Sequence, residues 1–218
     1  MTHPLIAREG WGRILFTFAL AGTVHFLCGV WIAVPFWIVA VLVLQFFRDP
    51  PRSVPDLPDS VVSPAHGRVV AIQPDQDPFS GSPSTRISIF MNIFSVHSNR
   101  IPVAGQIVAR KYYPGRFLNA ALEKASSENE RCAVQIETEE GRLVSCVQIA
   151  GWVARRVLTY IDVGDSVSRG QRYGFIRFGS RVDVYLPPDS EIVEGWKVGV
   201  VRKRHHCSSQ APSPLACP

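Results

Sequence analysis

Closely spaced cysteines are absent from this sequence of 218 residues. The chain has five cysteines, an odd number, and no two of them form the C-x-x-C pair of a zinc or redox site. They are Cys28, Cys132, Cys146, Cys207 and Cys217. We therefore expect a reduced, cytoplasmic setting. No spacing of histidines and carboxylates supports a metal hydrolase, so we also expect no metal site.

A basic tract interleaved with aromatic residues is also absent, and we expect no nucleic-acid partner. The formal net charge of +5 is a modest excess that suits an anionic membrane surface or an anionic substrate equally well. The 17 prolines and 16 glycines indicate many short strands and turns.

Asp, Glu, Lys and Arg are all missing from Ile14 to Phe47. A straight helix of that length would be about 51 Å long, beyond the roughly 30 Å of a bilayer's hydrocarbon core. Pro35 is the expected break, since it removes an amide donor. Either a re-entrant helical hairpin or a span followed by an interfacial helix fits this pattern.

A cleaved signal peptide is the other interpretation of this segment. It is disfavoured because the apolar stretch far exceeds a signal core of about 7 to 15 residues, and no small-x-small cleavage site follows it. We expect residues 1–50 to form a retained membrane anchor. Its orientation is not set by charge, since Arg8 and Arg13 on one flank match Arg48 and Arg52 on the other.

A proline-rich linker is expected at residues 51–60, and a catalytic domain at 61–218. Cys132 to Thr138 and Arg142 to Ile149, joined through Glu-Glu-Gly, are typical of a β-hairpin. The glycine turns at Gly164 and Gly170 resemble those of biotinyl/lipoyl barrel-sandwich domains. The fold class we expect is mainly β: a compact β sandwich or barrel-sandwich-like domain with an N-terminal helical membrane anchor.

Two histidines lie where chemistry is commonly held. His66 occupies a turn from Pro64 to Gly67, where Gly67 could supply a positive φ, and a lone loop histidine is usually a surface residue. His97 lies in a polar cluster that follows an alternating strand ending at Met91. It could act as a general base near neutral pH or be a satisfied structural histidine.

The run GFIRFGSRVDVYLP alternates in polarity from Ile176 to Leu186 and predicts one half-buried strand. Gly179 has no side chain to pack, and Ser180 puts a hydroxyl on the apolar side. One interpretation is a serine bonded to a nearby carbonyl beside a bulge. The other is a strained turn in which the hydroxyl attacks the preceding carbonyl.

Five blocks taken together carry a family resemblance, in the order FFRDPPR, SPAHG, FMNIFSVHSNRIPVAG, GRFLNAALEKASSENER and IRFGSRVDVYLP. With them the chain resembles the short bacterial and archaeal form of phosphatidylserine decarboxylase from about Arg8 to Pro187. A single glycine-serine pair would carry no weight, whereas five blocks in order are specific.

The resemblance implies a proenzyme that cleaves itself between Gly179 and Ser180 into a large chain, 1–179, and a small chain, 180–218. Ser180 would become a covalent pyruvoyl cofactor, which forms a Schiff base with the serine amine of the lipid. His97 would do acid/base work. The implied partners are an anionic phospholipid substrate, phosphatidylserine, and the cell membrane, with the catalytic domain on its cytoplasmic side; the product is phosphatidylethanolamine.

Two departures from the family pattern affect these expectations. His66 stands where the family usually has an aspartate that orients the base, and it brings no fixed negative charge. Beyond about Ser190 the sequence differs from the family pattern, and we expect the usual closing strands with their glycine turns to be lacking. The alternatives are a membrane-tethered β-sandwich that binds lipid or a partner without activity, and a decarboxylase of a related serine phospholipid such as archaetidylserine.

Overall fold

The structure, a computed structural model, describes residues 5–52, 54–55, 60–118, 120, 125–151, 156–177, 179–193 and 200–203. Cys207 and Cys217, with the end of the expected small chain and part of the expected linker, lie outside these residues. The other three cysteines are free.

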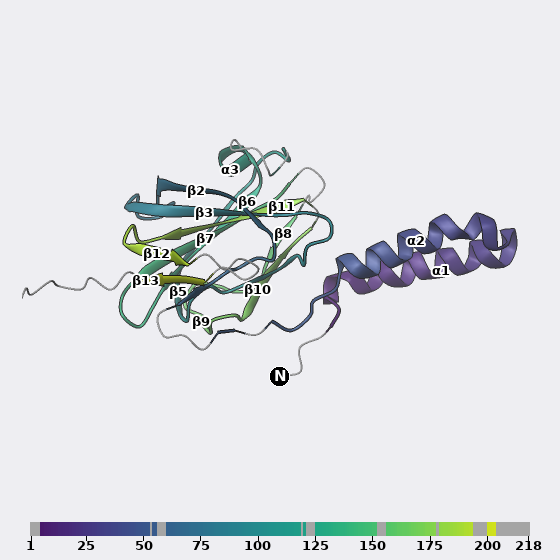
Figure 1. Cartoon of the computed structure of the whole chain (residues 1–218), viewed down its shortest axis with the longest axis horizontal. Helices are drawn as coiled ribbons and strands as arrows, with labels where there is room; N and C mark the ends of the chain where they lie inside the picture. Colours follow the sequence, from purple (N-terminus) through teal and green to yellow (C-terminus); the bar gives the residue numbers. More distant parts are fainter. Residues whose placement is uncertain are drawn as a thin grey trace, which may run out of the picture.

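An antiparallel pair of apolar helices projects from one end of a β domain (Figure 1). A short 3-10 helix, η1 (Arg8–Gly10), leads into α1 (Trp11–Cys28), and α2 (Val30–Phe46) returns to the domain. The segment Arg8–Cys28 is long and apolar enough to be a membrane anchor. Side chains at the far end of the pair are freely accessible, with Phe26 89% and Trp31 87% exposed. The hairpin thus shows an apolar surface to its surroundings.

The chain reverses at Gly29, which has a φ of 83°. Its amide donates to the carbonyl of His25 at 3.1 Å and ends α1. Pro35 lies inside α2, so the break expected there is wrong. A proline removes one amide donor and leaves the rest of the helix in place, whereas the reversal needs a left-handed residue, which glycine supplies without steric cost.

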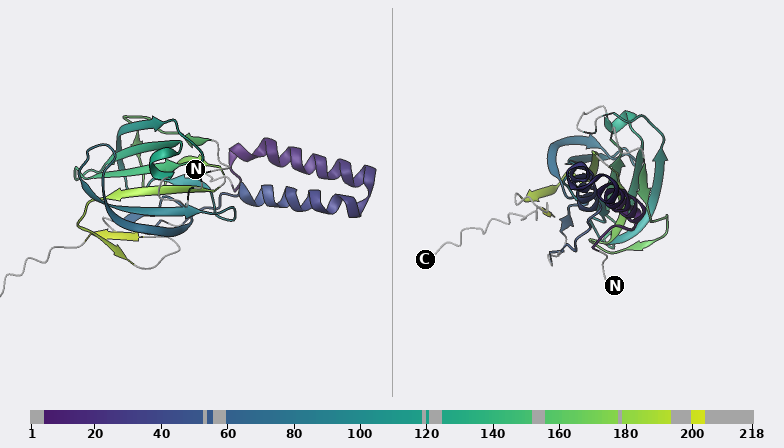
Figure 2. Two further views of the ribbon diagram at one scale, coloured as in Figure 1. Left: turned by 90° about the horizontal axis from the view of Figure 1, so that it is seen from above. Right: turned by 90° about the vertical axis from the view of Figure 1, so that its right-hand side faces the viewer.

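Three sheets form the β domain, as expected for a mainly β fold (Figure 2). The largest has seven strands in the order β2 (Arg68–Gln76), β3 (Pro83–Met91), β11 (Ser180–Leu186), β7 (Leu143–Ile149), β6 (Arg131–Glu137), β5 (Gly105–Tyr113) and β9 (Ser166–Val167). The second contains β4 (Ser98–Arg100), β10 (Arg172–Ile176) and β8 (Val157–Thr159). The third contains β1 (Val61–Val62), β13 (Val200–Lys203) and β12 (Ser190–Val193), and a short helix, α3 (Ala125–Glu128), precedes β6. The expectation that closing strands are lacking beyond about Ser190 is therefore wrong, since β12 and β13 pair there.

The hairpin expected from residues 132 to 149 is confirmed as β6 and β7, which pair antiparallel with Val134 opposite Cys146. The main core joins apolar residues of the large sheet, such as Val182, to Tyr173 and Ile176 of β10. A second cluster packs Phe46 and Phe47 at the end of α2 against Phe175. The helical hairpin therefore shares a core with the second sheet.

The single strand expected from Ile176 to Leu186 is wrong. β10 ends at Ile176 in one sheet, and β11 begins at Ser180 in another. Between them Gly179 has a φ of 60°, which ends the extended conformation. Phe178 lies outside the described residues. The alternation in the sequence is continuous because both strands are apolar on their core side, and it does not record the change of sheet.

β11 is also not half-buried, because every residue from Ser180 to Leu186 is buried. Its polar face is covered by the segment that includes Ala120 and α3. Arg181 makes a two-contact ion pair with Asp183, at 2.8 and 2.9 Å, and donates to the carbonyl of Ala120 at 3.4 Å. Ser126 of α3 donates to Asp183 at 3.3 Å. The residues that cover this face lie more than fifty positions earlier in the sequence. The local pattern around β11 therefore does not reveal that the face is buried.

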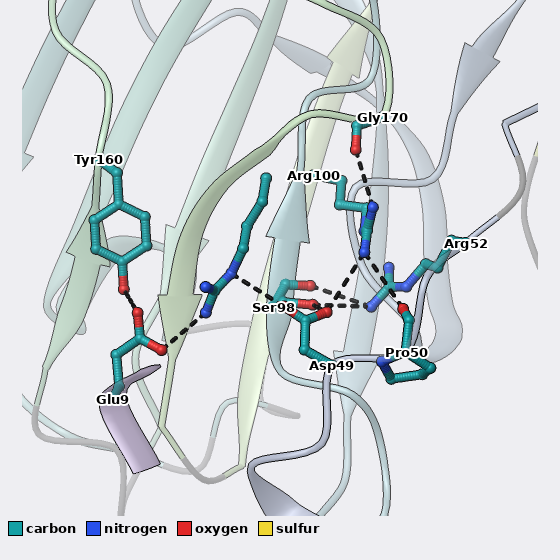
Figure 3. Close-up of polar contacts among 9 residues, drawn as sticks. Glu9, Asp49, Pro50, Arg52, Ser98, Arg100, Tyr160 and Gly170 are labelled. Atoms are coloured by element: carbon teal, nitrogen blue, oxygen red, sulfur yellow. Dashed lines mark hydrogen bonds and ion pairs between the residues drawn. The ribbon is translucent and has the colours of Figure 1, made fainter. Parts of the chain in front are cut away.

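A buried carboxylate ties the hairpin to the second sheet (Figure 3). Asp49, three residues after α2, is fully buried. It accepts a hydrogen bond from Ser98 at 2.7 Å, and it pairs with Arg100 at 3.4 Å and with Arg172 at 3.2 Å. Arg172 in turn pairs with Glu9, just before α1, at 2.9 Å. Both ends of the hairpin are therefore fixed to β4 and β10.

Replacing Asp49 by Asn should destabilise the folded chain by about 3 kcal/mol, because it takes the carboxylate away from the buried Arg100 and from the half-buried Arg172. Urea unfolding in detergent of an uncleaved Ser180→Ala chain would measure the change. Glu140→Gln, which removes an exposed ion pair with Arg142, is the matched control and should shift the midpoint little. Equal midpoints for the two variants would contradict the role assigned to Asp49.

Candidate active site

The loop between β3 and β4 lies against the junction where the chain changes sheet. Met91, the last residue of β3, pairs in register with Ser180. The carbonyl of His97, just before β4, accepts from the amide of Ile176 at 3.3 Å. The two ends of the loop therefore meet the two ends of the 176–180 segment.

Gly179 and Ser180 have the properties of a special site. Among the described residues no atom lies within 4 Å of the position a Cβ would take at Gly179, so the glycine is required by its φ of 60° and not by lack of space. Ser180 is fully buried, and its hydroxyl has no hydrogen-bond partner among the described residues. A buried hydroxyl without a partner costs free energy. The hydrogen bond from Ser180 to a nearby carbonyl, which was one interpretation of the sequence, is not observed among the described residues.

His97 is held as a neutral base. Its Nδ1 lies 2.8 Å from the carbonyl of Ser95, a contact that requires the proton on Nδ1 and leaves a lone pair on Nε2. Nε2 is buried and has no partner within the described part of the chain. The ring packs on Phe46 of α2, with centroids 4.3 Å apart. Burial is the largest of the causes that lower the pKa of His97 to about 4; the contact with the carbonyl of Ser95 acts against it, and the charge of Arg48 acts with it.

His66 differs from the other two candidates because it is exposed. Its loop is fixed by the carbonyl of Pro64, which accepts from the amide of Arg100 at 2.8 Å. Gly67 does not have the positive φ expected of it. It is needed for close approach, since a Cβ there would overlap the carbonyl oxygen of Phe90 in β3. The loop with His66 thus reaches the same end of β3 as Ser180.

Comparison with known proteins agrees with this geometry. The family model for phosphatidylserine decarboxylase matches residues 39–203. Proteins named phosphatidylserine decarboxylase proenzyme are 56% identical over 189 residues in Cupriavidus metallidurans and 57% identical over 188 residues in Aromatoleum aromaticum, each alignment covering 86% of this chain and 87% of the relative. A protein of that name in Nitrosomonas eutropha is 57% identical over 88% of this chain and 89% of its own.

This chain belongs to the phosphatidylserine decarboxylase family. The resemblance seen in the sequence is therefore confirmed. The relatives are named as proenzymes, which agrees with a protein that is processed.

Gly151 is a residue of this family member that sequence reasoning missed. It is buried two residues after the end of β7, and a Cβ there would overlap the carbonyl oxygen of Gly179. Only a residue without a side chain lets the backbone approach that carbonyl so closely. The signal in the sequence was a glycine two residues after an expected strand.

Asn129 was also missed, because it reads as one polar residue in a polar block. It is fully buried and joins three backbone groups. Its amide donates to the carbonyls of Leu118 at 2.8 Å and Ala150 at 2.7 Å, and its carbonyl accepts from the amide of Leu118 at 2.9 Å. Asn129 therefore fixes the segment before Gly151 against the segment that covers Arg181.

The polar cluster after Met91 does not act as one site. Ser98 and Arg100 hold Asp49, while Asn99 accepts from Gln148 at 2.7 Å. All three are buried and structural, which leaves His97 as the cluster's candidate for proton transfer.

In this decarboxylase-family chain the His97 imidazole should stay neutral from pH 8 to about 5, because its pKa is lowered to about 4. Its folded-state pKa lies below the ordinary value near 6.5, so the fold should lose stability as pH falls from 6.5 toward 4. NMR of the imidazole carbons in detergent-solubilised Ser180→Ala protein would follow the titration, with His97→Gln to assign the signal. Phe46→Ala should raise the midpoint by admitting water. A midpoint near 6.5 in the parent protein would contradict a buried base.

Proposed function

We propose that this chain decarboxylates phosphatidylserine to phosphatidylethanolamine after cleaving itself between Gly179 and Ser180. Family membership supports the reaction. The observation that carries the residue assignment is the buried hydroxyl of Ser180, which has no partner among the described residues and directly follows a left-handed glycine. A non-enzymatic lipid-binding module is not favoured, because the relatives bear the name of an enzyme.

The proposed cleavage uses the chain's own groups. Oγ of Ser180 attacks the carbonyl carbon of Gly179 while Nε2 of His97 takes the hydroxyl proton. The C–N bond breaks as His97 passes this proton to the departing nitrogen, which leaves an ester and a free amine. Loss of the α-proton of residue 180 then breaks the Cβ–O bond and releases the Gly179 carboxylate. Water replaces the nitrogen as ammonia leaves, and the small chain begins with a pyruvoyl group.

The residues at the junction fit a pyruvoyl group. Ser180 is enclosed, Met91 opposite it is apolar, and a group made from the chain itself needs no further binding site. Such a group supplies a ketone that can capture the lipid's amine and take up the electrons left when carbon dioxide departs. We assign to His97 the return of a proton to the substrate carbon. Its low pKa suits this step, because the imidazolium gives up its proton readily.

The small chain stays in place after cleavage because β11 pairs with β3 on one side and with β7 on the other. The buried pair of Arg181 and Asp183 fixes the first residues behind the new terminus. The chain therefore functions as a large chain, 1–179, and a small chain, 180–218, in one fold.

We place the hairpin, within residues 1–50, in the cell membrane and the catalytic domain on the cytoplasmic side. The substrate is a bilayer lipid, so an anchored site can reach it. Leu5 accepts from the amide of Asp49, so the two flanks of the hairpin are adjacent. Arg8, Arg13, Arg48 and Arg52 then lie on one side of the membrane, and basic flanks favour the cytoplasmic side.

The test of the proposed function is a time course of chain cleavage after synthesis in the presence of lipid. Ser180→Ala should remain one uncut chain, whereas the parent should give a small chain that begins with a pyruvoyl group. His97→Gln should slow cleavage by about 100-fold or more, as for loss of a general base. Intact-mass spectrometry would measure each product. An uncut parent that still decarboxylates the lipid would overturn the proposal.

His66 enters the same time course. We propose that it occupies the orienting position of the family's aspartate, where it supplies no fixed charge. His66→Asp should therefore cleave faster than the parent, because a carboxylate stabilises the imidazolium that forms at His97. An unchanged rate would show that the position has no part in processing.

Gly151→Ala should block cleavage while leaving the fold intact. The added methyl group meets a backbone oxygen that cannot rotate away, so it displaces the Gly179 carbonyl from its position. Gly22→Ala in α1, where no atom lies within 4 Å of an added Cβ, is the matched control. Circular dichroism would establish folding, and electrophoresis the cleaved fraction. Parent-like cleavage of Gly151→Ala would show that this contact is incidental.

A further inference from the structure

A turn just before His97 displays two large apolar side chains. Ile93 and Phe94 are 52% and 54% exposed, although the neighbouring residues Ser95 to His97 are buried. The proposed reaction uses His97 but gives no role to the turn that carries Ile93 and Phe94.

The exposure does not come from a loose loop. The side-chain oxygen of Asn92 accepts from the amide of Phe94 at 3.0 Å and from the hydroxyl of Ser95 at 3.1 Å. The amide of Ser95 donates to the carbonyl of Asn92 at 3.0 Å. These bonds fix the turn and hold the two side chains outward.

The turn lies at the base of the helical hairpin. Arg48 donates to the carbonyl of Phe94 at 2.7 Å and to the carbonyl of Gln45, in the last turn of α2, at 3.2 Å. One guanidinium therefore bridges the turn and the end of the second helix. The hairpin leaves the domain from the end that carries this turn (Figure 2).

We propose that Ile93 and Phe94 insert into the phospholipid surface beside the hairpin and form a second, independent membrane contact. Arg48 joins the turn to the end of α2, and its charge suits lipid phosphates. A bilayer that surrounds the helices up to the end of α2 would therefore meet the turn.

This contact would set how deeply the site sits in the lipid headgroups. Ser95, in the same turn, fixes the proton on Nδ1 of His97. The residues of the membrane contact and the residue that orients the base therefore lie within one five-residue segment, 93–97. The inference rests on the membrane location given above, so its test must separate the two.

Photo-crosslinking in the uncleaved Ser180→Ala chain tests it without any need for catalysis. p-Benzoylphenylalanine replaces Phe94 in full-length protein in nanodiscs of phosphatidylglycerol and phosphatidylethanolamine. Peptide mass spectrometry should then find lipid adducts at position 94. The same residue at Phe26, in the hairpin, is the positive control, and at Leu143, 40% exposed at the far end of β7 from Ile149, the negative control.

Each outcome is decisive. Adducts at positions 26 and 94 but not 143 support the inference. Adducts at 26 alone overturn it and leave the anchor intact, whereas none at 26 refutes the membrane location itself. A crosslink from 94 to a second copy of the chain or to another protein also overturns it.

Kinetics of the processed enzyme give a second readout. Ile93→Ser with Phe94→Ser should raise KM for phosphatidylserine in vesicles by about tenfold and leave kcat unchanged, since the turn's hydrogen bonds come from Asn92 and the backbone. A short-chain, monomeric phosphatidylserine should be turned over at the parent rate. Leu143→Ser should alter neither, and an equal loss on both substrates would show that the turn acts on the fold and not on the membrane.

Discussion

The peptide between Gly179 and Ser180 is fixed at both ends by different sheets. Ile176 is held by β8 and by the loop ending at His97, while Ser180 enters a strand paired on both sides. Glycine adopts a φ of 60° without steric cost, so the junction is held by its fixed ends and does not need stored strain. Proximity of a fixed hydroxyl to a fixed carbonyl is itself a large part of what such a reaction needs.

The anchor and the chemistry cannot be separated in this fold. Phe46, the last residue of α2, covers the ring of His97 and keeps its pKa low, and Asp49 locks both ends of the hairpin to the sheet that carries the loop. Removing the hairpin would therefore expose the base to water as well as remove the proposed membrane anchor. A tether alone would need neither contact.

Local pattern predicted those features that depend on neighbours in sequence. The apolar helices and the β6–β7 hairpin belong to this group, the latter with Gly141 at a φ of 72° in its turn. Ser180 and His97 became candidates through motifs and the family resemblance that these motifs carry. The burial of Arg181 and the need for Gly151 were not found, because both depend on segments brought together only by the fold.

The arginines on the two flanks of the apolar segment contradict each other about membrane orientation only if the segment is a single span. A single span would put Arg8 and Arg13 on the opposite side from Arg48 and Arg52, so neither side would be favoured. The reversal at Gly29 brings both pairs to the domain, where they add instead of cancelling. In the proposed membrane arrangement, this one glycine therefore puts all four arginines on the same side as the β domain.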